Sequence, residues 1–141
     1  MENIIPLLLI TFNRPEHTRQ TIDALRVQKP PLVYVFQDGP RANNNNDVER
    51  CLAVRKVIEQ EIDWECELHT YFSEHNRGCR DAIIHAISSV LREHESVIIV
   101  EDDIITITTE FKIELYDYVI NQSTEEVVKG SKTQKVTVTY E

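Results

Sequence analysis

The sequence predicts an α/β fold in which a mainly parallel sheet is covered by helices on both faces. Three observations support this prediction. Short apolar runs recur along the first hundred residues, segments of helical periodicity alternate with them, and turn-forming residues separate the two kinds of segment. Strands that are apolar at nearly every position are typical of parallel sheets buried on both sides. Their alternation with helices is typical of α/β proteins.

The first elements follow from local signals. The predicted strands cover residues 4–12, 32–36, 68–72 and 97–100. Pro15 and Glu16 favour the first turn of a helix, because proline needs no donor there and an acidic side chain suits the positive helix end. This helix is expected to reach about Arg26, with Ile22 and Leu25 facing the sheet.

The later helices are predicted from caps and apolar spacing. Asn46 or Asp47 can cap a second helix after the run of four asparagines. Its expected apolar stripe contains Val48, Cys51, Leu52, Val54, Ile58 and Ile62. A third helix is expected from about Cys79 to Glu93, with a core face of Ile83, Ile87, Val90 and Leu91.

The end of the chain differs from what precedes it. Thr109 can cap a last helix from roughly Glu110 to Asn121, carrying Phe111, Leu115 and Val119. Residues 123–141 are polar, with one alternating stretch, and are expected to form a tail or an edge strand. The predicted domains are therefore 1–122 and 123–141.

Composition excludes several classes of protein. The net charge of −9 argues against nucleic acid and against an anionic membrane surface as partners. No apolar run is long enough for a transmembrane segment, and the first six residues lack the basic region of a signal peptide. Cys51, Cys66 and Cys79 form no CxxC pair, so we expect reduced thiols in a cytoplasmic protein.

Polar residues gather where the predicted strands end. In open α/β sheets, ligands bind beyond the carboxyl ends of the strands. The candidate ligand-facing residues there are Thr11, Asn13, Arg14, Asp38, Asn76, Arg77, Glu101, Asp102 and Asp103. No GxGxxG, GxxxxGK[ST] or GxSxG motif is present, so dinucleotide, P-loop and serine-hydrolase sites are unsupported.

Each candidate also has a simpler interpretation. Glu101, Asp102 and Asp103 repel one another, and Mg²⁺ or Mn²⁺ would relieve that repulsion, but a solvated acidic turn would look the same. Arg14 beside a helix start suits a diphosphate, or it forms a surface ion pair. Asp38 before a glycine is an acceptor for a base N–H, or a turn residue.

Four segments together resemble GT-A glycosyltransferases. They are Leu9–Pro15, Gln37–Gly39, Asn76-x-Gly78 and Val97–Ile104, in that order. The sequence is similar to bacterial family 2-like sugar transferases and to eukaryotic N-acetylglucosaminyltransferases over about residues 4–121. The resemblance implies the Rossmann-like nucleotide-binding half of that fold. Ile83 and Ile84 depart from it, since they replace the Arg and Asn of an NxGxxxARN-like motif.

The resemblance also implies roles. Asp103, with Asp102, would hold Mn²⁺ or Mg²⁺ against the diphosphate of a UDP-sugar donor, and Glu101 would support this metal site. Asp38 would recognise the base, typically uracil. The remaining nucleotide-contacting candidates are Thr11, Asn13, Arg14, Asn76 and Arg77.

The implied activity is hexosyl or N-acetylhexosaminyl transfer to an unknown glycan, lipid or protein acceptor. No catalytic base is identified, because Glu110, Glu114 and Asp117 lie on a predicted solvated helix. We therefore expect only the donor-binding half, truncated after the acidic motif. Two other interpretations stay open: an inactive nucleotide-binding or interaction module, and a receiver-type phosphoacceptor domain beginning at Val97.

Overall fold

The computed structural model describes residues 4–103, 111–121 and 126–138. The chain divides into two compact units, Met1–Ile105 and Thr106–Glu141. The first unit contains β1 (Leu7–Thr11), α1 (Pro15–Gln28), β2 (Leu32–Gln37), α2 (Asn45–Glu61), β3 (Glu67–Phe72), α3 (Cys79–Leu91) and β4 (Ile98–Glu101). The predicted alternation of strands and helices in this unit is confirmed.

The first unit has one four-stranded sheet in the order β3-β2-β1-β4, and all of its pairings are parallel. Hydrogen bonds extend the pairing beyond the strand ends, since Ile98 N donates to Pro6 O and Asp102 N donates to Ile10 O. The chain therefore moves outward from β1 through β2 to β3, then returns to the other side of β1 for β4. The carboxyl ends of β1 and β4 meet at this change of direction.

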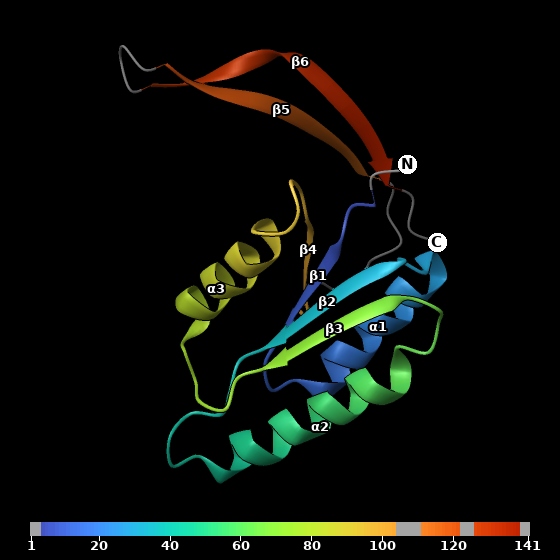
Figure 1. The fold of residues 1–141 in the computed structure, drawn as a ribbon, viewed down its shortest axis with the longest axis vertical. Coiled ribbons are helices and arrows are strands. Elements are labelled where there is room, and N and C mark those ends of the chain that lie inside the picture. The colour runs from blue at the N-terminus through green and yellow to red at the C-terminus, as the bar shows by residue number, and fades with distance from the viewer. Residues whose placement is uncertain (1–3, 104–110, 122–125, 139–141) are drawn as a thin grey trace. The chain divides into compact units, whose positions relative to one another are not determined.

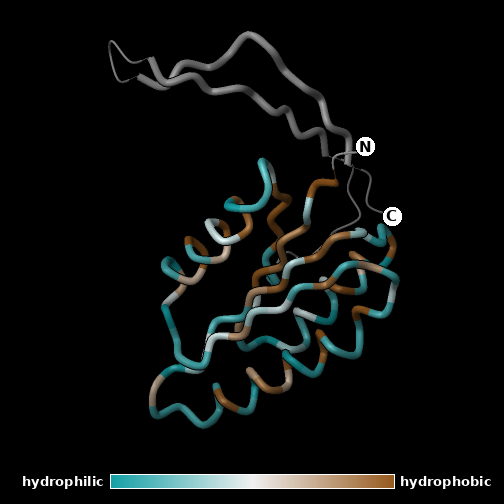
Figure 2. The backbone as a smooth tube through the Cα atoms, viewed as in Figure 1, coloured by the Kyte–Doolittle hydropathy of each residue, from teal (hydrophilic) through white to brown (hydrophobic). Residues whose placement is uncertain are grey.

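Helices cover both faces of the sheet, as predicted: α1 and α2 lie on one side and α3 on the other (Figure 1). Leu9, Val33 and Val35 pack with Ile22 and Ile58 on the first face. On the opposite face, α3 contributes Ala86 and Val90 to a smaller cluster with Leu8, Leu32, Tyr34 and Phe36. The central strands carry long hydrophobic stretches, whereas hydrophobic and hydrophilic residues alternate along the helices (Figure 2).

Strand β4 is more exposed than a buried parallel strand should be. The sequence predicted a buried strand, yet Ile98 and Ile99 are 51% and 42% exposed. The reason is topological, because among the described strands β4 pairs with β1 alone and lies at an edge of the sheet.

Two predictions about α2 are wrong. Its cap is Asn44, whose side chain accepts a hydrogen bond from Asp47 N, so neither Asn46 nor Asp47 takes that role. Its buried face carries Cys51, Val54, Val57 and Ile58. Val48 and Leu52, from the expected stripe, are 42% and 56% exposed. Residues 51 and 52 point about 100° apart on a helix, so only one of them can face the sheet.

The second unit is a two-stranded antiparallel sheet of β5 (Phe111–Asn121) and β6 (Glu126–Val138). The predicted helix over 110–121 is therefore wrong for its described residues. Residues 111–116 alternate apolar and polar as a strand does, and aromatic and β-branched residues are frequent up to residue 120. The register runs from Phe111 opposite Val138 to Asn121 opposite Glu126. In the tail, the structure has the strand β6 over Glu126–Val138, and Thr109 lies outside the described residues.

Candidate functional site

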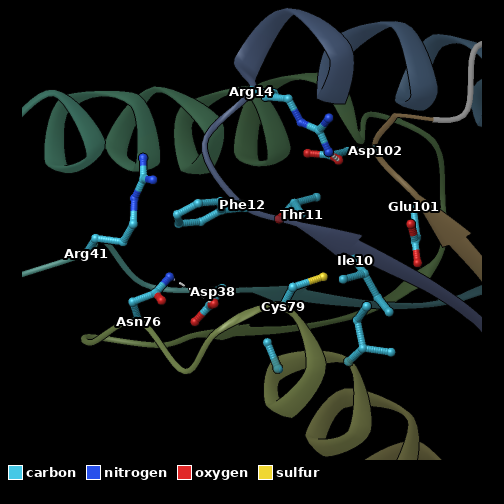
Figure 3. Close-up of a pocket in the computed structure, with 12 residues that line it drawn as sticks. Ile10, Thr11, Phe12, Arg14, Asp38, Arg41, Asn76, Cys79, Glu101 and Asp102 are labelled. Carbon is cyan, nitrogen blue, oxygen red and sulfur yellow. Dashed lines mark hydrogen bonds and ion pairs between the residues drawn. The ribbon is translucent and has the colours of Figure 1, made fainter.

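A pocket of about 280 Å³ opens where the chain changes direction between β1 and β4. Its lining comes from four separate segments of the first unit: Ile10, Thr11, Phe12, Arg14, Asp38, Arg41, Asn76, Cys79, Ala82, Ile83, Glu101 and Asp102. Figure 3 shows these side chains around a common space. Ligands of open α/β sheets bind at this kind of position. The volume of the pocket lies just below the usual range for small-molecule pockets, which begins at about 300 Å³.

Asp38 and Asn76 form one side of the pocket and fix each other (Figure 3). Asp38 Oδ1 accepts hydrogen bonds from Gly39 N at 2.9 Å and Arg77 N at 2.8 Å. Asn76 Nδ2 donates to Asp38 Oδ2 and to Gly39 O, both at 3.0 Å. Asp38 is buried, and Oδ2 accepts a single bond from Asn76, so this oxygen retains acceptor capacity for a ligand N–H.

Gly39 allows the two loops to approach so closely. A Cβ at this position would lie 2.6 Å from the carbonyl carbon of His75 and 2.7 Å from its nitrogen. No side chain fits there, because ordinary contacts begin at about 3.4 Å. Gly39 therefore sets the distance between Asp38 and the turn that carries Asn76.

Arg14 and Asp102 form the opposite side of the pocket. Arg14 Nη2 donates to Asp102 Oδ1 at 2.7 Å, and Nη1 lies 3.7 Å from Asp103 Oδ2. The backbone of Arg14 is held by the first turn of α1, since its carbonyl accepts bonds from both N and Oγ1 of Thr18. Thr21 Oγ1 in turn donates to Asp102 O at 3.3 Å. The ends of β1 and β4 are thus joined by an ion pair between residues far apart in sequence.

The Asp102 carboxyl is buried, but only one of its two oxygens has a hydrogen-bond partner within the described residues. Its side chain is 4% exposed, and Oδ2 has no hydrogen-bond partner within the described part of the chain. Burial raises the pKa of Asp102 above its ordinary value, although Arg14 acts in the opposite direction. A buried polar atom without a partner is costly and is rare in folded proteins, so it often marks a functional site.

Asn13 does not line the pocket; its side chain faces away toward α2. Asn13 Nδ2 donates to Asp47 Oδ1 at 2.9 Å, and Arg41 Nε donates to Asp47 Oδ2 at 2.6 Å. Arg41 N donates to the same carboxylate, which is fully buried. These bonds hold the pKa of Asp47 well below its ordinary value, and the bond from the Arg41 side chain has the largest effect. Asp47 thereby anchors the loop that carries Arg41, a pocket residue.

Two other predicted residues also lie outside the pocket. Arg77 donates to Ser73 Oγ at 3.3 Å and lines a second depression of about 480 Å³ beside β3. Asp103 is 49% exposed and is not part of the lining. Six of the nine candidate positions, Thr11, Arg14, Asp38, Asn76, Glu101 and Asp102, are therefore brought together in one pocket.

The described residues contain no group of three or more His, Cys, Asp or Glu side chains placed to hold a metal ion. The chemistry of Glu101, Asp102 and Asp103 suits a hard divalent cation, since all their donors are carboxylate oxygens. Asp102 also offers an oxygen without a partner in the described structure. Within the described residues these side chains do not come together as a metal-binding group, and Arg14 takes the position of a counter-ion to Asp102 and Asp103.

The sequence pattern did not point to Arg41 or Cys79, which complete the lining together with apolar residues of β1 and α3. Arg41 lies in an irregular stretch, and its bonds to Asp47 and its position over the Phe12 ring, 5.9 Å from the centroid, place it at the pocket. Cys79 is the first residue of α3, and a cysteine outside any CxxC pair gave no signal of a binding role in the sequence.

Within the described residues, no helix combines the length and the apolar character that crossing a bilayer requires. Comparisons of the chain with models of known protein families, with curated proteins and with solved structures find no match.

Proposed function

We propose that the first unit binds a nucleoside diphosphate sugar, with uridine as the nucleoside, and serves as the donor-binding half of a glycosyltransferase. One observation carries this proposal. Six residues predicted as ligand contacts, from four separate segments, line a single pocket at the carboxyl edge of a parallel sheet. Pockets at that position bind nucleotides in many open α/β proteins.

The two sides of the pocket suit the two ends of such a ligand. Asp38 Oδ2 offers an acceptor for the N–H of a uracil ring, and Asn76 holds this carboxylate in place. Apolar surface from Ile10, Phe12 and Ala82 would contact the base and ribose. Arg14, on the opposite side, presents a guanidinium that matches phosphate oxygens.

Charge supports a role for a divalent cation in this proposal. The lining contains the carboxylates of Asp38, Glu101 and Asp102 but only the guanidiniums of Arg14 and Arg41. A diphosphate would meet an excess of negative charge, which a cation held by Asp102 and Asp103 would reverse. When bound, Mg²⁺ or Mn²⁺ would also neutralise charge that develops on the leaving diphosphate.

The experiment is calorimetric titration of the full chain with UDP, in the presence of Mn²⁺ and in the presence of EDTA. Ala82→Leu should fill the pocket and weaken UDP binding by about tenfold or more, a loss near 1.4 kcal/mol. Ser88→Leu is the matched control, because Ser88 is an exposed residue of the same helix. Absence of UDP binding under both conditions, or equal effects of the two variants, would refute the proposal.

The second candidate is a module that binds nucleotide without transferring sugar. The catalytic base of a transferase is not identified, so donor hydrolysis and transfer assays with the full chain would separate the two candidates. A receiver-type domain beginning at Val97 is not favoured, because β4 pairs with β1 as the fourth strand of the preceding sheet.

A further inference from the structure

The second depression, of about 480 Å³, is larger than the pocket and shares only Asn76 with it. Its volume lies within the usual range for small-molecule sites. The lining combines aromatic and polar side chains: Phe36, Tyr71, Phe72, Ser73, Glu74, His75, Asn76, Arg77 and His85. The proposed nucleotide site leaves this second depression without a role.

Aromatic rings give the second depression a flat apolar surface. Phe36 and Tyr71 are opposite each other in the register of β2 and β3, and their rings stack with centroids 4.6 Å apart and planes 21° apart. His85 of α3 meets the Phe36 ring edge-on, with centroids 5.9 Å apart. Phe36 is buried, whereas Tyr71 remains 47% exposed. The exposed part of the Tyr71 ring is therefore held in place by the ring beside it and is open to a ligand.

Backbone hydrogen bonds fix the loop between β3 and α3 that carries the polar side chains. Ser73 N donates to Gln37 O at 3.0 Å, and Arg77 N donates to Asp38 Oδ1 at 2.8 Å. The loop is thus attached at both ends to residues that end or follow β2. A ligand would have little backbone to order on binding, which lowers the cost of association.

The polar side chains offer both donors and acceptors. Glu74 can only accept hydrogen bonds and the Arg77 guanidinium can only donate them, and their formal charges cancel. Arg77 donates one bond, to Ser73 Oγ at 3.3 Å, and forms no ion pair within the described residues. In their neutral form, the imidazoles of His75 and His85 each offer one donor and one acceptor. This mixed set matches hydroxyl groups, which donate and accept, better than an anion, which only accepts.

We infer that the second depression binds a neutral glycan, with one pyranose ring lying on Tyr71. The C–H groups on one side of a pyranose form an apolar surface of slightly positive charge, which suits the negative face of an aromatic ring. Hydroxyls at the edge of the sugar then bond to Glu74 and Arg77. This site is additional to the nucleotide pocket, and its occupation does not require UDP.

The test is titration of the isotope-labelled full chain with cellotriose, maltotriose and chitotriose, one at a time, followed by the NMR shifts of backbone amides. At least one glycan should bind with a Kd of about 1 mM and shift amides of residues 71–77. Tyr71→Ala should weaken this binding about tenfold or more, while Tyr71→Phe keeps the ring and should stay within about threefold of the wild type. Thr70→Ala is the matched control, because Thr70 is exposed on the same strand but lies on the other face of the sheet.

Arg77→Gln tests the polar side and covers the case in which Tyr71→Ala folds poorly. It removes the guanidinium but keeps the backbone N–H that bonds to Asp38, and should weaken glycan binding by about threefold or more. Binding of none of the three glycans with a Kd below about 10 mM, or equal affinity of the wild type, Tyr71→Ala and Arg77→Gln, overturns the inference. Glucuronate that binds more tightly than every neutral glycan, and loses this binding in Arg77→Gln, overturns it as well, because the site would then select anions.

Discussion

Gly39→Ala should destabilise the first unit by displacing the turn at His75. The new Cβ would lie 2.6 Å from the backbone carbon and oxygen of His75, and a backbone cannot rotate out of the way as a flexible side chain can. One segment must move by about 0.8 Å to reach ordinary contact. Such overpacking costs roughly 1–3 kcal/mol.

The same movement would stretch two hydrogen bonds between the loops, Asn76 Nδ2 to Asp38 Oδ2 and Arg77 N to Asp38 Oδ1. Each contributes about 1 kcal/mol, so the total expected loss is about 3–5 kcal/mol. For a unit of this size that loss corresponds to a fall in Tm of more than about 10 °C.

The measurement is thermal unfolding followed by fluorescence of Trp64, the single tryptophan, which is buried in the core on the α1 and α2 side. Ala42→Ser is the control, because Ala42 is exposed in the same connection and should leave Tm nearly unchanged. A Tm for Gly39→Ala within about 2 °C of the wild type would refute the steric argument.

Two further predictions concern the buried carboxylate and the core face of α2. Asp47→Asn should lower Tm above about pH 5, and the difference from the wild type should shrink as pH falls below about 4. The reason is that a carboxylate with a depressed pKa stabilises the fold above its unfolded pKa, and this contribution is lost as it becomes protonated in the folded state. A difference in Tm that stays constant from pH 3 to pH 7 would contradict this expectation. Ile58→Ala should cost about 2–5 kcal/mol in urea unfolding, because Ile58 is fully buried. Leu52→Ala should cost under about 1 kcal/mol, since Leu52 is 56% exposed, and equal costs would show that the helix faces the sheet differently.

Part of the site could be predicted because several of its polar residues lie at the ends of strands in the sequence. Asp38 follows β2 and Glu101 ends β4, so knowing where the strands end was enough to place both at one edge of the sheet. The orientation of the side chains was not predictable in this way. Asn13 and Arg14 are adjacent, yet Asn13 bonds to Asp47 and Arg14 bonds to Asp102.

The sequence by itself determined the α/β class and the positions of β1 to β4, because apolar runs and helix signals act over a few neighbouring residues. Local patterns were misleading for residues 111–121, where a helix was predicted although residues 111–116 alternate apolar and polar as a strand does. The cap of α2 also lies within four identical asparagines, of which Asn44 takes the role by accepting a hydrogen bond from Asp47 N.

Only the tertiary structure decided which strands are neighbours. Placing β4 beside β1 brings Asp102 to Arg14 across 88 positions of sequence, and it leaves Ile98 at an edge of the sheet. No local pattern encodes this choice, because it depends on how three helices share the two faces of one sheet. The ion pair that closes the pocket, and the buried oxygen of Asp102 beside it, are consequences of that packing.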